Sequence, residues 1–195
     1  MTDMEPVQPT DALASDKKGK KEKEKKPLWR EIVEWVVTLA VAVGVAMLVR
    51  TFVFEPVKVD GHSMESTLHD REVMFVTKWE YVTGDPERFD VVICHYPNRG
   101  RLDFVKRVVG LPGDTVEIKD GYLYVNDVRY EEEYLTHRPD YVMPKHTVAE
   151  GHYFVLGDNR SNSNDSHLIG DISRDMIVGH VRQVIFPFDA WRTIE

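Results

Sequence analysis

The distribution of hydrophobic positions divides the chain into three parts. Residues 1 to about 26 are polar, rich in lysine and glutamate, and nearly free of large apolar side chains, which is typical of disordered segments. Fifteen residues without a charge follow, from Trp35 to Val49. From Val57 onward, short runs of β-branched and aromatic residues alternate with turn sequences. The pattern therefore predicts a polar tail, one long apolar helix and a β-rich unit.

The apolar segment has the length of a membrane-spanning helix. Crossing a bilayer takes roughly 20 residues, and residues 32–54 suffice if Glu34 and Arg50 extend their charged ends toward the headgroups. The segment is apolar on all sides, whereas a buried core helix would be amphipathic. A cleaved signal peptide would need small residues after the run, but a bulky sequence begins at Arg50. We therefore expect a transmembrane signal-anchor over residues 29–54.

The uneven distribution of charge predicts the orientation of this anchor. The 195-residue chain has a net charge of -8, which argues against a general nucleic-acid binder. Residues 16–30 nevertheless hold eight basic and three acidic residues. Basic segments beside a membrane span stay in the cytoplasm. We expect residues 1–28 to be a disordered cytoplasmic tail and residues 55–195 an extracytoplasmic domain of a single-pass cell-membrane protein.

The β-rich part predicts a mainly β fold. Turn signals such as those at residues 83–86 and 119–121 separate its strand-like runs. Short strands at this spacing are typical of a sandwich or barrel, and we expect an antiparallel β-barrel-like domain. Residues 131–145 are polar and contain proline, which predicts a loop or insertion. The expected strands are Val73–Val76, Asp90–Cys94, Phe104–Val109, Val116–Ile118, Tyr122–Val125, Tyr153–Leu156 and Val181–Phe186.

Several familiar site patterns are missing from the sequence. There is no phosphate loop, His-Glu-x-x-His motif or paired cysteine, so we expect neither a metal nor a cofactor. The single cysteine, Cys94, excludes an intrachain disulfide, and its apolar neighbours favour a buried hydrophobe over a nucleophile. His62 adjoins Ser63, but neighbouring side chains of an extended segment point to opposite faces. A His62–Ser63 pair is therefore not expected.

A lysine within an apolar strand carries the clearest chemical signal. Strand alternation places Phe104, Lys106 and Val108 on one face. Lysine is rarely buried, although a lysine that reaches the surface at a strand end fits this pattern equally well. Burial lowers a lysine pKa by up to about 3–5 units, which would turn Lys106 into a usable base near neutral pH. A serine hydroxyl needs such a base to act as a nucleophile.

Four ordered motifs resemble those of type I signal peptidases. The resemblance extends from about Trp29 to the C-terminus and is greatest to the short, single-anchor form common in Gram-positive bacteria. The matching segments are Ser63-Met64 with Thr67-Leu68 (serine motif), Arg88–Val92 (strand motif), Lys106–Asp114 (lysine motif) and Gly157–Gly170 (last motif).

The resemblance implies a serine endopeptidase that removes signal peptides from secreted preproteins. Ser63 would attack the scissile carbonyl, Lys106 would act as general base, and Ser163 would hydrogen-bond the lysine ammonium. The backbone N–H groups of Ser63 and Gly61 would stabilise the oxyanion, because Gly61 stands where relatives place a serine donor. The expected bracing residues are Asp158, Asn159, Arg160 and Asp165, with Asp165 near Arg107.

The resemblance also implies the partners of the protein. These are preproteins whose signal peptide is still in the membrane, and the lipid bilayer itself; no nucleic acid and no metal are expected. The substrate would add as an extended strand, with shallow pockets for alanine-like residues before the cut. Its expected contacts are Pro56, Val57, Val59, Asp60, Met64, Asp103, Phe104 and Val105.

Two positions depart from the family pattern. Ser66 replaces a usual proline, which we expect to loosen the turn after the nucleophile. His167 stands where arginine is common, so any charge there would depend on pH.

Two alternatives remain open on the sequence. A membrane-anchored β-domain that only binds a partner would separate Ser63 from Lys106 or leave the lysine solvated. A self-cleaving repressor-type peptidase has a similar dyad, but it carries a DNA-binding domain where this chain has an apolar segment. The aromatic residues Phe186, Phe188 and Trp191 fit either the core or the membrane interface.

Overall fold

The computed structural model describes residues 27–52, 54–97 and 102–194, and the chain divides into two compact units, residues 1–42 and 43–195. Helix α1 (Leu28–Phe52) begins in the first unit. Its stretch Leu28–Val49 is long and apolar enough to cross a membrane, and none of it is buried against protein. The pattern of the sequence predicts this helix. Most of the predicted polar tail, residues 1–26, lies outside the described residues.

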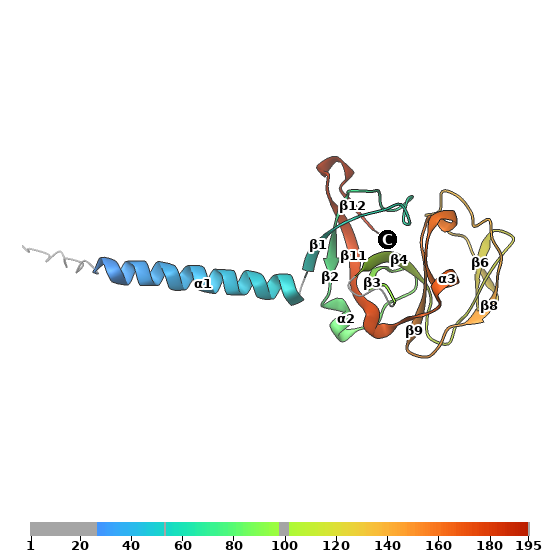
Figure 1. Ribbon diagram of the computed structural model, residues 1–195, viewed down its shortest axis with the longest axis horizontal. Helices are drawn as coiled ribbons and strands as arrows, with labels where there is room; N and C mark the ends of the chain where they lie inside the picture. The colour runs from blue at the N-terminus through green and yellow to red at the C-terminus, as the bar shows by residue number, and fades with distance from the viewer. Residues whose placement is uncertain (1–26, 53, 98–101, 195) are drawn as a thin grey trace, which may run out of the picture. The chain divides into compact units, whose positions relative to one another are not determined.

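The second unit contains a curled antiparallel sheet, in which the strands bend as a half-barrel (Figure 1). Neighbouring strands are antiparallel throughout, which confirms the mainly β, barrel-like prediction. The order is β1 (Phe54–Lys58), β2 (Val73–Thr77), β11 (Ile177–Phe186), β3 (Val91–His95), β4 (Asp103–Gly110), β9 (His152–Leu156) and β10 (Ile172–Ser173), and β12 (Arg192–Thr193) pairs with β11.

A smaller four-stranded sheet packs its own core. Its order is β7 (Val128–Tyr130), β6 (Tyr122–Val125), β5 (Thr115–Lys119) and β8 (Met143–Thr147). The prediction of a loop over residues 131–145 is wrong at its end, because β8 starts at Met143. Met143 lies opposite Ile118 of β5 and is buried, so the local polarity of the segment concealed a strand that only its partner defines.

Short helical turns connect the strands. They are α2 (Glu80–Thr83), α3 (Ser166–Ile169), η1 (Arg160–Asn162), η2 (Arg174–Met176) and η3 (Phe188–Ala190).

Side chains of β4 alternate between two cores, as the sequence predicts. Phe104 and Val108 pack with a cluster that contains Cys94, whereas Val105 packs on a cluster that contains Met64. Cys94 is fully buried, and this burial raises the pKa of its thiol to about 12. The cysteine therefore behaves as the buried hydrophobe that its neighbours predict.

Three aromatic residues near the C-terminus are exposed. Phe186, Phe188 and Trp191 leave 51%, 78% and 62% of their surface open, and the two phenylalanine rings meet edge to face. This exposure removes the core alternative for these residues. Their contact with a membrane interface remains a prediction.

Candidate active site

Ser63 and Lys106 lie within hydrogen-bonding distance although 43 residues separate them. Lys106 Nζ is 2.8 Å from Ser63 Oγ and donates a second bond of 2.8 Å to the carbonyl of Val105. Lys106 is 2% exposed. The binding-domain alternative predicted a separated pair or a solvated lysine, and the structure shows neither.

The loop between β1 and β2 positions the serine. It closes through a hydrogen bond from Val59 N–H to the carbonyl of Glu72, and Leu68 N–H caps a turn that begins at Met64. Met64 and Leu68 are buried in the core. Because these apolar neighbours fix the turn, Ser63 is held at the rim of the core and faces β4.

The surroundings of Lys106 make its amine easier to deprotonate than that of a free lysine. Burial lowers the pKa of this amine to about 8, against a weaker opposing effect of the Asp165, Cys94 and Asp158 charges. The ring of Phe104 lies 4.9 Å from Nζ. An apolar strand thus supplies the desolvation that the sequence pattern suggested.

Arg107 points to the opposite side of β4 and forms an ion pair with Asp158. Arg107 Nη2 lies 2.9 Å from Asp158 Oδ2, and Nε lies 3.1 Å from Oδ1. The described contacts pair Arg107 with Asp158, and the expected approach of Asp165 to Arg107 stays a prediction. Asp165 lies on the lysine side, where it accepts from the N–H of Gly157 at 2.8 Å and binds His167 Nδ1 at 2.5 Å.

Thr67 and Tyr134 join the Arg107–Asp158 pair. Thr67 Oγ1 donates to Asp158 at 2.5 Å, and the guanidinium of Arg107 lies 3.9 Å from the centre of the Tyr134 ring. Sequence reasoning placed Thr67 in a motif but gave it no role. It missed Tyr134 entirely, because this residue comes from the predicted loop and only folding brings it here.

Ser163 does not make the expected bond to the lysine. Its Oγ is buried and has no hydrogen-bond partner within the described residues. It nevertheless lies beside the dyad: a Cβ on Gly157 would be 2.2 Å from Ser163 Oγ and 2.5 Å from the carbonyl oxygen of Ser63. This close approach explains why glycine precedes Asp158, since any side chain there would push Ser63 or Ser163 away.

The expected oxyanion donors differ in their availability. The N–H of Gly61 donates to Asp70 Oδ1 at 3.1 Å, and this bond lowers the pKa of the Asp70 carboxyl. The N–H of Gly61 is therefore engaged in this structure, and its role as an oxyanion donor stays a prediction. Asn159 holds the loop that carries Ser63. Its backbone N–H donates to the carbonyl of Ser63 and its Nδ2 donates to the carbonyl of His62, both at 3.0 Å.

A pocket of about 130 Å³ adjoins Ser63. It contains all of the residues expected to contact the substrate except Pro56, which is exposed because strand alternation turns it away from its neighbour Val57. Met74 and Ile93 also line it, and these come from β2 and β3, which no sequence motif connects to the serine. The complete lining is Val57, Lys58, Val59, Asp60, Gly61, Ser63, Met64, Met74, Ile93, Asp103, Phe104 and Val105.

The two departures from the family pattern have visible structural counterparts. Ser66 adopts a φ of 135°, which the ring of a proline forbids, and its Oγ is buried without a partner in the described part of the chain. A proline could therefore not adopt the backbone conformation that Ser66 has here. His167 binds Asp165 and stacks on Tyr141, with ring centroids 4.5 Å apart.

Within the described ranges, no three His, Cys, Asp or Glu side chains gather as metal ligands would.

Comparisons with known proteins agree with the motifs. The family model described as signal peptidase, peptidase S26, matches residues 32–186. Signal peptidase I P of Bacillus subtilis subsp. natto is 40% identical and spans 88% of this chain and 97% of its own length. Signal peptidase IB of Staphylococcus aureus (strain COL) is 38% identical over 84% of this chain and 94% of its own.

A solved signal peptidase I from Enterococcus faecalis V583 is 35% identical to this chain. It aligns with a TM-score of 0.43 and covers 50% of this chain and 97% of its own. The family model and the two relatives cover most of the chain at substantial identity, which also excludes the repressor-type alternative. The chain therefore belongs to the type I signal peptidases of the S26 peptidase family.

Proposed function

We propose that this protein is a membrane-bound serine endopeptidase that removes signal peptides with a Ser63–Lys106 dyad. The observation that carries the proposal is the 2.8 Å hydrogen bond between the Ser63 hydroxyl and a buried lysine amine. Membership of the signal peptidase family supports the reaction and the class of substrate.

The lowered pKa of Lys106 supports its role as general base. With a pKa of about 8, roughly one molecule in ten carries the neutral amine at pH 7. A free lysine would be neutral in only about one molecule in 2,500. The neutral amine accepts the Ser63 proton as Oγ attacks the scissile carbonyl. The resulting ammonium then donates that proton to the leaving amine, and its bond to the Val105 carbonyl keeps Nζ in place.

Stabilisation of the oxyanion rests on fewer donors than the family pattern implies. The N–H of Ser63 donates to no acceptor within the described residues, so it is the first candidate. Gly61 N–H contributes only if its bond to Asp70 opens when substrate binds. We keep Ser163 as an orienting residue because its hydroxyl is buried beside the Ser63 carbonyl with its hydrogen-bonding capacity unused.

The pocket beside Ser63 suits an extended substrate with small side chains. Among the described residues, β1 pairs with β2 alone, and the first residues of β4 pair with β3 because β9 joins β4 from Arg107 onward. These two strand edges next to the pocket are therefore open to an added strand, as β-strand addition requires. A volume of about 130 Å³ favours alanine-like side chains.

Helix α1 supports attachment to the membrane. Its 22-residue apolar stretch is about 33 Å long, which matches the hydrocarbon core of a bilayer. The basic residues before it support an orientation with the N-terminus in the cytoplasm and the peptidase unit outside.

Cleavage of a purified preprotein by the full chain in lipid vesicles tests the dyad. Ser63→Ala and Lys106→Ala should each abolish processing. Matched controls are Ser161→Ala, at an exposed residue, and Lys119→Ala, at a half-buried residue; both lie outside the pocket and should leave the rate unchanged. Undiminished cleavage by either dyad variant would end the dyad hypothesis. A wild-type chain that cleaves no preprotein would favour the partner-binding alternative.

A further inference from the structure

The turn formed by Gly157, Asp158 and Asn159 contacts the loop that carries the nucleophile, Ser63. Asn159 holds the carbonyls of His62 and Ser63, and Asp158 accepts a hydrogen bond from Thr67. Gly157 lies so close to the Ser63 carbonyl that a Cβ would clash with it at 2.5 Å. A small displacement of this turn therefore moves Ser63 relative to Lys106.

A buried arginine, Arg160, holds this turn through a backbone carbonyl. Arg160 is 2% exposed, and its Nε donates to the carbonyl of Gly157 at 3.1 Å. Its remaining nitrogens donate to both carboxylate oxygens of Glu132, at 2.6 and 2.8 Å. Burial alone would lower the pKa of Arg160, but the bonds and charge of Glu132 raise it above its ordinary value. The pair has the bidentate geometry of strong arginine–carboxylate contacts.

Glu132 is also connected to Arg107, the second arginine that holds the turn of residues 157–159. Its Oε1 accepts from the Tyr134 hydroxyl at 2.5 Å, and the Tyr134 ring lies against the guanidinium of Arg107. Arg107 in turn holds Asp158. The side chain of Glu132 is 4% exposed. One carboxylate from the segment after β7 is thus connected to both arginines that fix the turn.

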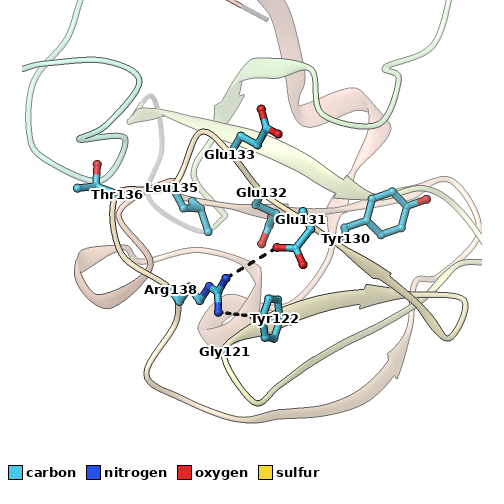
Figure 2. A pocket seen from close by; sticks show the side chains of 9 residues that line it. All are labelled: Gly121, Tyr122, Tyr130, Glu131, Glu132, Glu133, Leu135, Thr136 and Arg138. Carbon is cyan, nitrogen blue, oxygen red and sulfur yellow. Dashed lines mark hydrogen bonds and ion pairs between the residues drawn. The ribbon is translucent and has the colours of Figure 1, made fainter.

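We propose that Glu132 is a positioning residue of the peptidase, acting through Arg160 and the turn of residues 157–159 on the geometry of Ser63 and Lys106. This inference rests on the proposed dyad function. Figure 2 shows Glu132 beside its exposed neighbour Glu131, which forms an ion pair with Arg138 instead. The two glutamates are adjacent in sequence, but only Glu132 belongs to the buried network.

The test compares Glu132→Gln with Glu131→Gln in the full chain, using preprotein cleavage in lipid vesicles. Glutamine keeps the size of the side chain but leaves Arg160 without its counter-charge. We expect kcat of Glu132→Gln to fall about 10²-fold with KM within about threefold, because misplacement of catalytic groups by an ångström costs that much. Glu131→Gln, whose parent side chain is 54% exposed, should match wild type.

The pH profile separates positioning from a loss of folded protein. A displaced turn admits water to the amine, so the rise of kcat/KM with pH should move to higher pH in Glu132→Gln. Rates are expressed per reactive serine, counted with an acylating probe. If kcat per reactive serine and the pH midpoint both equal those of wild type, the proposal is overturned.

Tyr134→Phe decides the question if Glu132→Gln does not fold. It removes only the hydroxyl that binds Glu132 and retains the ring against Arg107. We expect a smaller loss of kcat, about threefold to tenfold, with the same direction of pH shift. Unchanged kcat and midpoint would overturn the proposal. Failure of the dyad function is a separate result, since it appears as cleavage by Ser63→Ala in the same assay.

Discussion

The two faces of β4 give two adjacent buried basic side chains, Lys106 and Arg107, different partners. On one face, Lys106 has a serine hydroxyl and a backbone carbonyl as hydrogen-bond partners, and burial lowers its pKa to about 8. On the other face, Arg107 is equally buried but is paired with Asp158 and covered by the ring of Tyr134.

The difference shows how one strand separates chemistry from support. A buried amine without a bound carboxylate loses its proton easily and can act as a base. A buried guanidinium stays charged and serves as a fixed branching point for hydrogen bonds. Four predictions test this division, from the largest expected effect to the smallest.

Lys106→Met should remove activity without harming the fold. The loss of a general base costs about 10²–10⁴-fold in rate. Because the pKa of the folded-state amine lies near 8 rather than 10.5, burial of the ammonium opposes folding at pH 7 by about 3 kcal/mol. Denaturant unfolding should therefore show a variant at least as stable as wild type. Substantial destabilisation would contradict the assignment of Lys106 as a desolvated base.

Arg107→Met, in contrast, should lower the free energy of unfolding. It leaves Asp158, 2% exposed, as a buried charge without its cation, which costs about 3–5 kcal/mol. The control is Arg129→Met, whose exposed pair with Glu131 is worth at most about 1 kcal/mol. Equal unfolding free energies for the two variants would show that the Arg107 face does not carry the support inferred for it.

Activity should follow the neutral fraction of Lys106. Below pH 8, kcat/KM should fall about tenfold per pH unit, and it should level off above pH 8. Lys106 makes its own contribution to stability. The amine binds its proton more tightly in the unfolded chain than in the folded one. The unfavourable contribution of Lys106 to folding therefore has its full size below pH 8, and it disappears as pH rises from 8 to about 10.5. A rate that stays flat between pH 6 and 9 would argue against a titrating lysine base.

Ser163→Ala should have the smallest effect on stability. Its hydroxyl is buried without a partner in the described residues, so its removal should leave the unfolding free energy unchanged or raise it by up to about 1 kcal/mol. The matched control is Ser166→Ala, because Ser166 Oγ accepts from the buried N–H of Val155 at 2.9 Å. That control should lose about 1–3 kcal/mol. A Ser163→Ala variant as unstable as the control would indicate an unrecognised partner.

Much of the fold is local enough to be predicted from the sequence. The apolar run from Trp35 to Val49 can only be a long helix, and the alternation around Lys106 predicts which side chains share its face. The strand β8 escaped prediction because its residues are mostly polar and only the pairing with β5 reveals it. The same is true of Tyr134, whose partners lie far away in sequence.

The candidate site likewise has a part that the sequence predicts and a part that only the fold reveals. Motifs in the sequence identified Ser63, Lys106 and most of the pocket, because each lies in a short, recognisable segment. They did not decide hydrogen bonds between segments. For that reason the sequence did not show that Asp158 pairs with Arg107, that the Gly61 N–H binds Asp70, or that Ser163 makes no bond to Lys106.

The sequence by itself determined that an apolar helix precedes a β-rich unit and that a serine and a lysine are its reactive candidates. Periodicity and residue type are local properties, and they survive without knowledge of the fold. The tertiary structure alone decided that Asp158 pairs with Arg107 and that Glu132 pairs with Arg160. Pairing of buried charges depends on distances across the core, and those distances exist only after the strands have packed.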